Sequence, residues 1–132
     1  MSASSAIWNF AKTFVREFVG EAKRVLLPTH SIEIVTQDDV RLVLRSLGRE
    51  VVANKRFGTV KSEERVLARF DAIRWIEVAR ERNDDAPETW KVSLYISWLS
   101  RVQIGRTNDA LEASVAGARL STITGKKVIA HP

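Results

Sequence analysis

The segment Trp90-Lys91-Val92-Ser93-Leu94-Tyr95-Ile96-Ser97-Trp98 decides the fold. Every second residue along it is apolar, and the residues between are polar or, at Tyr95, amphipathic. A period of two places one set on each face of an extended chain, so the segment is expected to be a β-strand with one buried face. Residues 101 to 104 resume the apolar pattern and are expected to pair with this strand as a hairpin.

Shorter segments upstream carry the same alternation and are separated by polar or glycine-containing turns. Such patterning is typical of strands in an antiparallel sheet. The strands are expected at residues 32 to 35, 40 to 45 and 50 to 53, and as two strands within 63 to 82 that break near Asp71. Residues 54 to 61 are expected to form a basic loop, and residues 83 to 87 a polar turn. The chain therefore predicts about seven strands, all antiparallel.

Residues 108 to 123 are expected to form a helix with a face of small apolar side chains. Thr107 or Asn108 is expected to cap its start, because a side-chain oxygen there accepts a hydrogen bond from a free backbone amide. Gly125 is the expected C-terminal cap, since glycine readily adopts the left-handed conformation. The fold class expected from these elements is α+β: a sheet or partial barrel followed by a C-terminal helix.

A second, amphipathic helix is expected before the sheet, at residues 4 to 27, where the apolar period is that of a helix. The aromatic residues of its apolar face are Trp8, Phe10, Phe14 and Phe18, and the basic residues of its polar face are Lys12, Arg16, Lys23 and Arg24. Pro28 ends it. Such a helix suits its own sheet, a groove of a partner protein, or a lipid headgroup layer. Residues 1–28 are thus expected to be an attachment helix and residues 29–132 the β domain.

Length and composition limit the classes of protein to which the chain can belong. Its 132 residues are 45% hydrophobic and 28% charged, which suits one compact domain with a terminal appendage. The absence of cysteine excludes disulfides, thiolate metal sites and cysteine nucleophiles. No apolar run reaches the roughly 20 residues needed to cross a bilayer. A net charge of +5 favours anionic surfaces such as lipid headgroups, nucleic acid or acidic proteins.

Four segments carry a resemblance to a known family. They are Phe70-Asp71-Ala72-Ile73-Arg74-Trp75-Ile76-Glu77-Val78, Trp90-Lys91-Val92-Ser93-Leu94, residues 106 to 113, and residues 118 to 128 with their Thr-Gly ending. Together with the order of the elements, they resemble small bacterial pleckstrin-homology-like (PH-like) domains associated with membrane proteins, over about residues 30 to 128. The resemblance implies a PH-like sheet or partial barrel without a catalytic motif, and a cytoplasmic protein peripheral to the membrane. Lipid-binding PH domains carry basic residues in the first strand turn, where this chain has Asp38-Asp39, so specific phosphoinositide recognition is not expected.

The turn at residues 97 to 101 is a second expected contact point. It places Trp98 and Leu99 where a tight hairpin favours Gly, Asn or Asp. An apolar turn is unfavourable in water unless another surface covers it, so these residues are expected to be covered by residues 4 to 27 or to contact a partner or a bilayer. The expected function is a non-enzymatic interaction or adaptor domain: an accessory or assembly subunit that docks, through its N-terminal helix, on a larger membrane-associated complex or on a membrane surface.

The basic loop supplies an alternative function. Lys55, Arg56, Phe57 and Lys61 interleave positive charge with an aromatic ring, as a surface that follows phosphates and stacks on bases would. The loop does not match the aromatic motif of the RNA-recognition domain. A nucleic-acid-binding module is therefore the competing class, and an ordinary solvated loop is the plain structural explanation.

Catalysis and metal binding find little support in the sequence. The two histidines, His30 and His131, stand apart from any nucleophile or metal-ligand motif, and no phosphate-binding glycine loop is present. The acidic pairs Asp38-Asp39, Glu63-Glu64 and Asp84-Asp85 fall at expected turns or strand ends, where carboxylates are usual. No catalytic residue, metal site or cofactor is expected, and the chain is not expected to be an enzyme.

Overall fold

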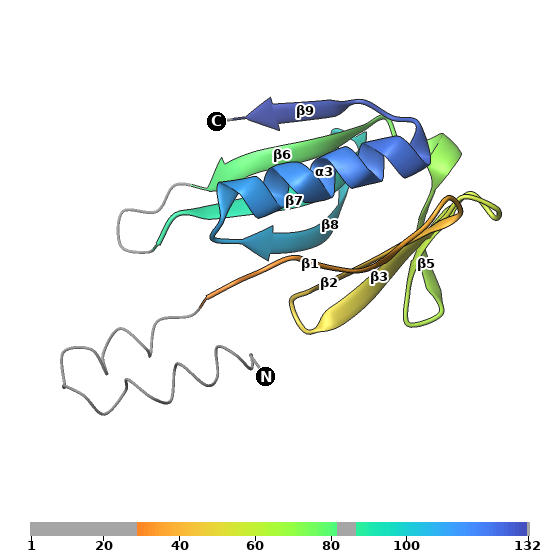
Figure 1. Cartoon of the computed structure of the whole chain (residues 1–132). Coiled ribbons are helices and arrows are strands. Elements are labelled where there is room, and N and C mark those ends of the chain that lie inside the picture. Colours follow the sequence, from red (N-terminus) through yellow and green to blue (C-terminus); the bar gives the residue numbers. More distant parts are fainter. Residues whose placement is uncertain (1–28, 82–86, 132) are drawn as a thin grey trace.

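The computed structural model describes residues 29–81 and 87–131 of the chain. Within these residues the chain is mostly β, with nine strands in two sheets and one C-terminal α-helix (Figure 1). The prediction of a β-rich fold with one helix near its C-terminus is confirmed. The helix expected at residues 4 to 27 lies outside the described residues, as does most of the turn expected at 83 to 87.

Five strands form the first sheet in chain order, each antiparallel to the next. They are β1 (Glu33–Gln37), β2 (Arg41–Ser46), β3 (Arg49–Asn54), β4 (Thr59–Ser62) and β5 (Arg65–Arg69). Short connections join them, as in any meander of hairpins. The strands expected before residue 54 are confirmed. The loop expected over residues 54 to 61 is wrong in its second half, because β4 pairs with both β3 and β5.

Four strands form the second sheet, in the order β8-β7-β6-β9. They are β6 (Trp75–Glu81), β7 (Thr89–Ser97), β8 (Ser100–Thr107) and β9 (Val128–His131), and a short 3-10 helix, η1 (Phe70–Ala72), precedes β6. β7 contains all of the alternating segment except its last residue, Trp98, and η1 confirms the expected break near Asp71. The expectation of about seven strands, all antiparallel, is wrong, because β9 lies parallel to β6 at the sheet edge. Four residues are too few to display a strand period.

The C-terminal helix α3 (Ala110–Thr124) packs on the inner face of the second sheet (Figure 1). The side chain of Asp109 caps it by accepting a hydrogen bond of 2.8 Å from a first-turn amide. The expected caps, Thr107 or Asn108, are therefore wrong, since the Thr107 hydroxyl instead accepts from the Asp109 amide at 3.0 Å. Gly125 is confirmed as the C-terminal cap with φ 77°. In the described part of the chain, no helix has the length and apolar character needed to span a membrane.

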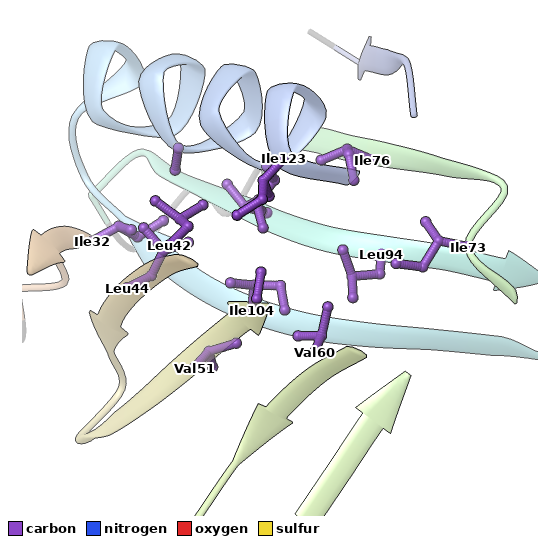
Figure 2. Close-up of a cluster of buried hydrophobic side chains, with 14 of the residues drawn as sticks. Ile32, Leu42, Leu44, Val51, Val60, Ile73, Ile76, Leu94, Ile104 and Ile123 are labelled. Atoms are coloured by element: carbon purple, nitrogen blue, oxygen red, sulfur yellow. The ribbon is translucent and has the colours of Figure 1, made fainter. Parts of the chain in front are cut away.

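The hydrophobic core lies between α3 and the inner faces of the two sheets (Figure 2). Its largest fully buried side chains include Leu42, Leu44, Ile73, Ile76, Leu94, Ile104 and Leu120. Val92 and Leu94, both from the alternating segment, are 0% exposed. Gly117 lets α3 approach the sheet closely, because a Cβ there would lie 2.8 Å from Val78 Cγ2. The apolar face predicted for β7 is therefore part of the sheet surface on which α3 packs.

The two sheets meet where β2 approaches β8. The Ser46 hydroxyl, at the end of β2, donates to the Ser31 carbonyl at 2.7 Å and accepts from the Arg106 amide at 3.1 Å. Gly105 lies directly beside it, and a Cβ at that position would fall 2.7 Å from Ser46 Cβ. Ser46 is itself buried, so these hydrogen bonds satisfy polar groups that water does not reach.

Candidate interaction surface

The tip of the β7–β8 hairpin carries the two most exposed large hydrophobic side chains of the described residues. Trp98 is 77% exposed and Leu99 is 76% exposed, and they are neighbours in the chain. Ser97 and Ser100 flank them and pair with each other to close the hairpin. Single exposed hydrophobic residues are common on protein surfaces. Two adjacent ones at a hairpin tip form an apolar patch, which is a candidate interaction site.

The tip forms without glycine because the strand pairing shifts just before it. The register changes by one residue between Tyr95 and Ser97, which is a β-bulge. A bulge alters the local twist, so the turn that follows it no longer needs the left-handed residues of a tight two-residue hairpin. Neither Trp98 nor Leu99 has a positive φ. The expectation that this turn needs residues with positive φ, such as Gly, Asn or Asp, is therefore wrong.

Basic side chains stand at the same end of the second sheet. The Arg74 amide, just before β6, donates to the Tyr95 carbonyl at 2.8 Å, which places Arg74 beside the last residues of β7. The Lys127 carbonyl, just before β9, accepts from the Ile76 amide at 2.8 Å, one strand further across. Both side chains are exposed, and η1 and the C-terminal end of α3 lie at this end too, on the right in Figure 1. We call Trp98, Leu99, Arg74 and Lys127 the tip surface.

A polar cluster on the outer face of the second sheet holds the base of this hairpin. The buried Glu77 carboxylate accepts hydrogen bonds from Arg101 Nε at 2.8 Å and from Trp75 Nε1 at 3.4 Å, and His131 Nε2 lies 3.5 Å from it. Tyr95 stacks on Trp75 with ring centroids 4.0 Å apart, and the Arg101 guanidinium carbon lies 4.9 Å from the Tyr95 centroid. One side chain or more from each of the four strands is thereby joined in a single network.

Burial and hydrogen bonding act in opposite directions on Glu77. Burial raises the pKa of its carboxyl group, whereas the hydrogen bonds from Arg101 and Trp75 and the Arg101 charge lower it. The lowering prevails, so the pKa of Glu77 lies below its ordinary value. Glu77 is therefore an anion that anchors β6 to β8, and it is not poised to exchange protons near neutral pH.

The basic turn between β3 and β4 is a separate surface. Lys55, Arg56 and Phe57 are exposed there, and Phe57 is 69% exposed. Asn54 Oδ1 accepts hydrogen bonds from the amides of Arg56 at 2.8 Å and Phe57 at 3.3 Å, which fixes the turn. Lys61, which was expected in the same loop, is exposed on strand β4 instead. The structure thus brings the first three predicted residues together on one turn and places the fourth on the adjoining strand.

A cavity of about 470 Å³ opens beside this turn, toward the β1–β2 turn and the second half of α3. Its charged lining residues are Asp38, Asp39, Lys55 and Arg119. The Asp38 carboxylate accepts hydrogen bonds from the amides of Val40 and Arg41, both at 2.8 Å, and these hold the pKa of Asp38 below its ordinary value. Because acidic and basic groups face the same space, the cavity lacks the uniformly positive lining that recognises phosphate.

The residues considered for catalysis or metal binding lie in separate places. His30 precedes β1, whereas His131 lies at the C-terminal end of β9. Glu63 and Glu64 form the β4–β5 turn, and Asp84-Asp85 lies outside the described residues. Over residues 29–81 and 87–131, no three His, Asp or Glu side chains gather in a group suited to a metal ion.

The aromatic and basic residues of the expected N-terminal helix, from Trp8 to Arg24, lie outside the described residues. Comparison with protein-family models, with curated proteins and with solved structures finds no match to this chain. The function proposed below therefore rests on the residues and on their geometry.

Proposed function

We propose that this protein is a non-enzymatic interaction domain of PH-like architecture. It acts as an accessory or assembly subunit that docks on a larger membrane-associated complex or on a membrane surface, in the cytoplasm and at the periphery of the membrane. Residues 1–28 are its attachment helix, and residues 29–132 form the domain that presents the tip surface. The partner is a protein assembly, and no cofactor is required.

The order and packing of the described elements support the PH-like class. A meander of five antiparallel strands is followed by three further antiparallel strands, and a C-terminal helix then closes the core. α3 contacts β6 and β7 of the second sheet and β2 of the first, so it covers the space between the sheets. This arrangement supports the proposed partial barrel with its closing helix, whereas the parallel strand β9 lies outside the expected order.

The exposure of Trp98 and Leu99 is the observation that carries the functional proposal. Fully burying a side chain of the size of leucine gains roughly 1.5–3 kcal/mol, so a partner that covers both residues gains about twice that before the costs of association. The polar network around Glu77 and Arg101 holds the hairpin that presents them. A rigid hairpin loses little conformational freedom on docking, which favours binding.

Membrane fractionation and co-purification of the tagged full-length chain from its own cells test the proposal. The wild-type chain is expected in the membrane fraction and, after mild detergent extraction, in a defined complex with constant stoichiometry that is recovered in reciprocal pull-downs. The variant Trp98→Ser/Leu99→Ser is expected to reduce recovery in the membrane fraction at least about tenfold, which corresponds to roughly 1.4 kcal/mol.

Leu111→Ser is the matched control, because Leu111 is 68% exposed but lies in the first turn of α3, at the opposite end of the second sheet. It is expected to fractionate like the wild-type chain. A wild-type chain that remains unaccompanied in the cytosolic fraction contradicts the proposal.

A nucleic-acid-binding module is the second candidate, favoured by one observation. Phe57 projects into solvent beside Lys55 and Arg56 on a turn whose backbone Asn54 fixes, and an exposed aromatic ring beside cations suits base stacking. Fluorescence anisotropy with single-stranded RNA and DNA tests it. Binding that falls steeply with salt and is lost in Lys55→Gln/Arg56→Gln supports this candidate, and the absence of binding at low salt rejects it.

A further inference from the structure

We infer that the tip surface enters the headgroup layer of an anionic lipid bilayer. Trp98 and Leu99 insert toward the acyl chains, while Arg74 and Lys127 contact the lipid phosphates. The inference rests on the proposed function and deepens it, because it names the chemistry of the surface that the tip contacts.

The size of the apolar patch favours a lipid surface over a protein groove. An aromatic side chain buries roughly 150–250 Å², so Trp98 and Leu99 together fall well short of the roughly 800 Å² that each partner contributes to a standard protein interface. Their immediate neighbours, Ser97 and Ser100, are polar and extend the patch in neither direction. A narrow apolar tip of two residues matches shallow insertion, which needs no complementary pocket.

The composition of the tip fits the depth of such an insertion. Tryptophan concentrates at membrane–water interfaces, where its ring is buried while its N–H group still meets polar groups. Leu99 is wholly apolar and adds acyl contact beside it. The serines on either side remain at the level of the headgroups, where their hydroxyls keep hydrogen-bonding partners.

The charge around the tip complements an anionic surface. Arg74 and Lys127 are exposed at the ends of neighbouring strands, and adjacent strands are about 5 Å apart, so both cations lie within a few strand spacings of the hairpin. An exposed carboxylate at this end, Asp71 of η1, lies 3.6 Å from the Arg69 guanidinium, whose charge offsets it. Each basic residue held near an anionic bilayer strengthens binding about fivefold.

The hairpin base fixes the direction in which the tip points. Arg101, two residues from Leu99, is held at 2.8 Å by Glu77, whose side chain is 11% exposed. Arg101 also lies over the ring of Tyr95 on the partner strand. Because this network crosses from β6 to β8, it restricts the orientation of the hairpin that carries Trp98 and Leu99.

Vesicle binding by the purified full-length chain tests the inference. Vesicles of phosphatidylcholine alone are compared with vesicles that also contain phosphatidylglycerol. The wild-type chain is expected to prefer the anionic vesicles, and Trp98→Ser/Leu99→Ser is expected to weaken that binding at least about tenfold. Arg74→Gln/Lys127→Gln is expected to weaken it about 25-fold and to reduce its dependence on salt.

Depth of insertion gives a second readout that a structural effect of the substitutions would not reproduce. Lipids with brominated acyl chains quench a tryptophan that lies near them. The wild-type chain is expected to show a quenched component that is missing from Trp98→Phe, while Leu111→Ser binds and is quenched like the wild-type chain. If Trp98→Ser/Leu99→Ser binds anionic vesicles like the wild-type chain, or if Trp98→Phe shows undiminished quenching, the inference is overturned.

The failure of this inference and the failure of the proposed function are distinguishable. If the variants at Trp98 and Leu99 lose membrane recovery in cells but bind pure vesicles normally, the tip contacts protein, so the proposed function stands and the lipid contact is rejected. If the wild-type chain never fractionates with membranes, the proposed function itself fails.

Discussion

Replacing Gly105 by alanine is expected to lower the free energy of unfolding by about 2–6 kcal/mol, because no space exists for the added methyl group. Its Cβ would lie 2.7 Å from Ser46 Cβ, 2.8 Å from Ser46 Oγ and 3.0 Å from Ile32 Cγ1. Favourable carbon–carbon contacts need about 3.5–4.0 Å, so Ser46 must move, and overpacking of this kind costs about 1–3 kcal/mol. Movement of Ser46 also breaks its hydrogen bonds to Ser31 and Arg106, which adds about 1–3 kcal/mol.

A double-mutant cycle separates the collision from other effects of the substitution. Ser46→Gly alone removes the obstructing atoms but leaves the Arg106 amide without its acceptor, at a cost of about 1–3 kcal/mol. In that background, Gly105→Ala no longer meets Ser46 and has no hydrogen bond of Ser46 left to break, so its cost is expected to fall by at least about 2 kcal/mol. Urea unfolding of the full-length chain, followed by circular dichroism, measures all four proteins. Additive effects, or a Gly105→Ala variant within about 0.5 kcal/mol of the wild-type chain, would refute the close packing of β2 on β8.

Three further outcomes follow from the described geometry. Glu63 and Glu64 form the β4–β5 turn with φ values of 52° and 68°, a conformation that favours Asn-Gly. Glu63→Asn/Glu64→Gly is therefore expected to raise the free energy of unfolding by about 1 kcal/mol and to shift the urea midpoint upward. Glu77→Gln is expected to lower the free energy of unfolding by about 1–3 kcal/mol at neutral pH. Because the folded-state pKa of Glu77 is lowered, its contribution is present above the ordinary value of 4.5 and is lost as the pH falls through the folded-state pKa, so wild-type and variant unfolding curves should converge in acid. Trp98→Ser/Leu99→Ser is expected to change the free energy of unfolding by less than about 0.5 kcal/mol, because both side chains are exposed, and a larger loss in the same assay would show that the tip serves the fold.

Local periodicity predicted the strands that have one buried and one exposed face. β7 was clear because its apolar positions, among them Val92 and Leu94, all meet the core. β9 was not predictable in this way, because its four residues pair with β6 residues that lie 52 positions earlier in the chain. The helix cap is Asp109 and not the predicted Thr107, because Thr107 is the last residue of β8 and is buried there.

The candidate surface was predictable only where its residues are neighbours in sequence. Trp98 and Leu99 stand together in a turn, so their patch could be named without coordinates. Arg74 and Lys127 join them only through the order of strands in the second sheet, which no local pattern contains. The Glu77–Arg101 pair was also missed, although a charged residue between the apolar Ile76 and Val78 of a strand is a signal for an outward-facing partner.

The hairpin turns differ in whether their backbone conformation limits the choice of residue. At Leu47 and at the Glu63-Glu64 turn, the backbone takes positive φ values, so these residues are tolerated against a local preference. At the β7–β8 tip the bulge removes that demand, and polar residues at positions 98 and 99 would complete the same hairpin. Burial does not explain Trp98 and Leu99 either, since both side chains are exposed. With backbone geometry and core packing excluded as reasons, we expect the apolar tip to contact a surface outside the described domain, as the proposed function requires.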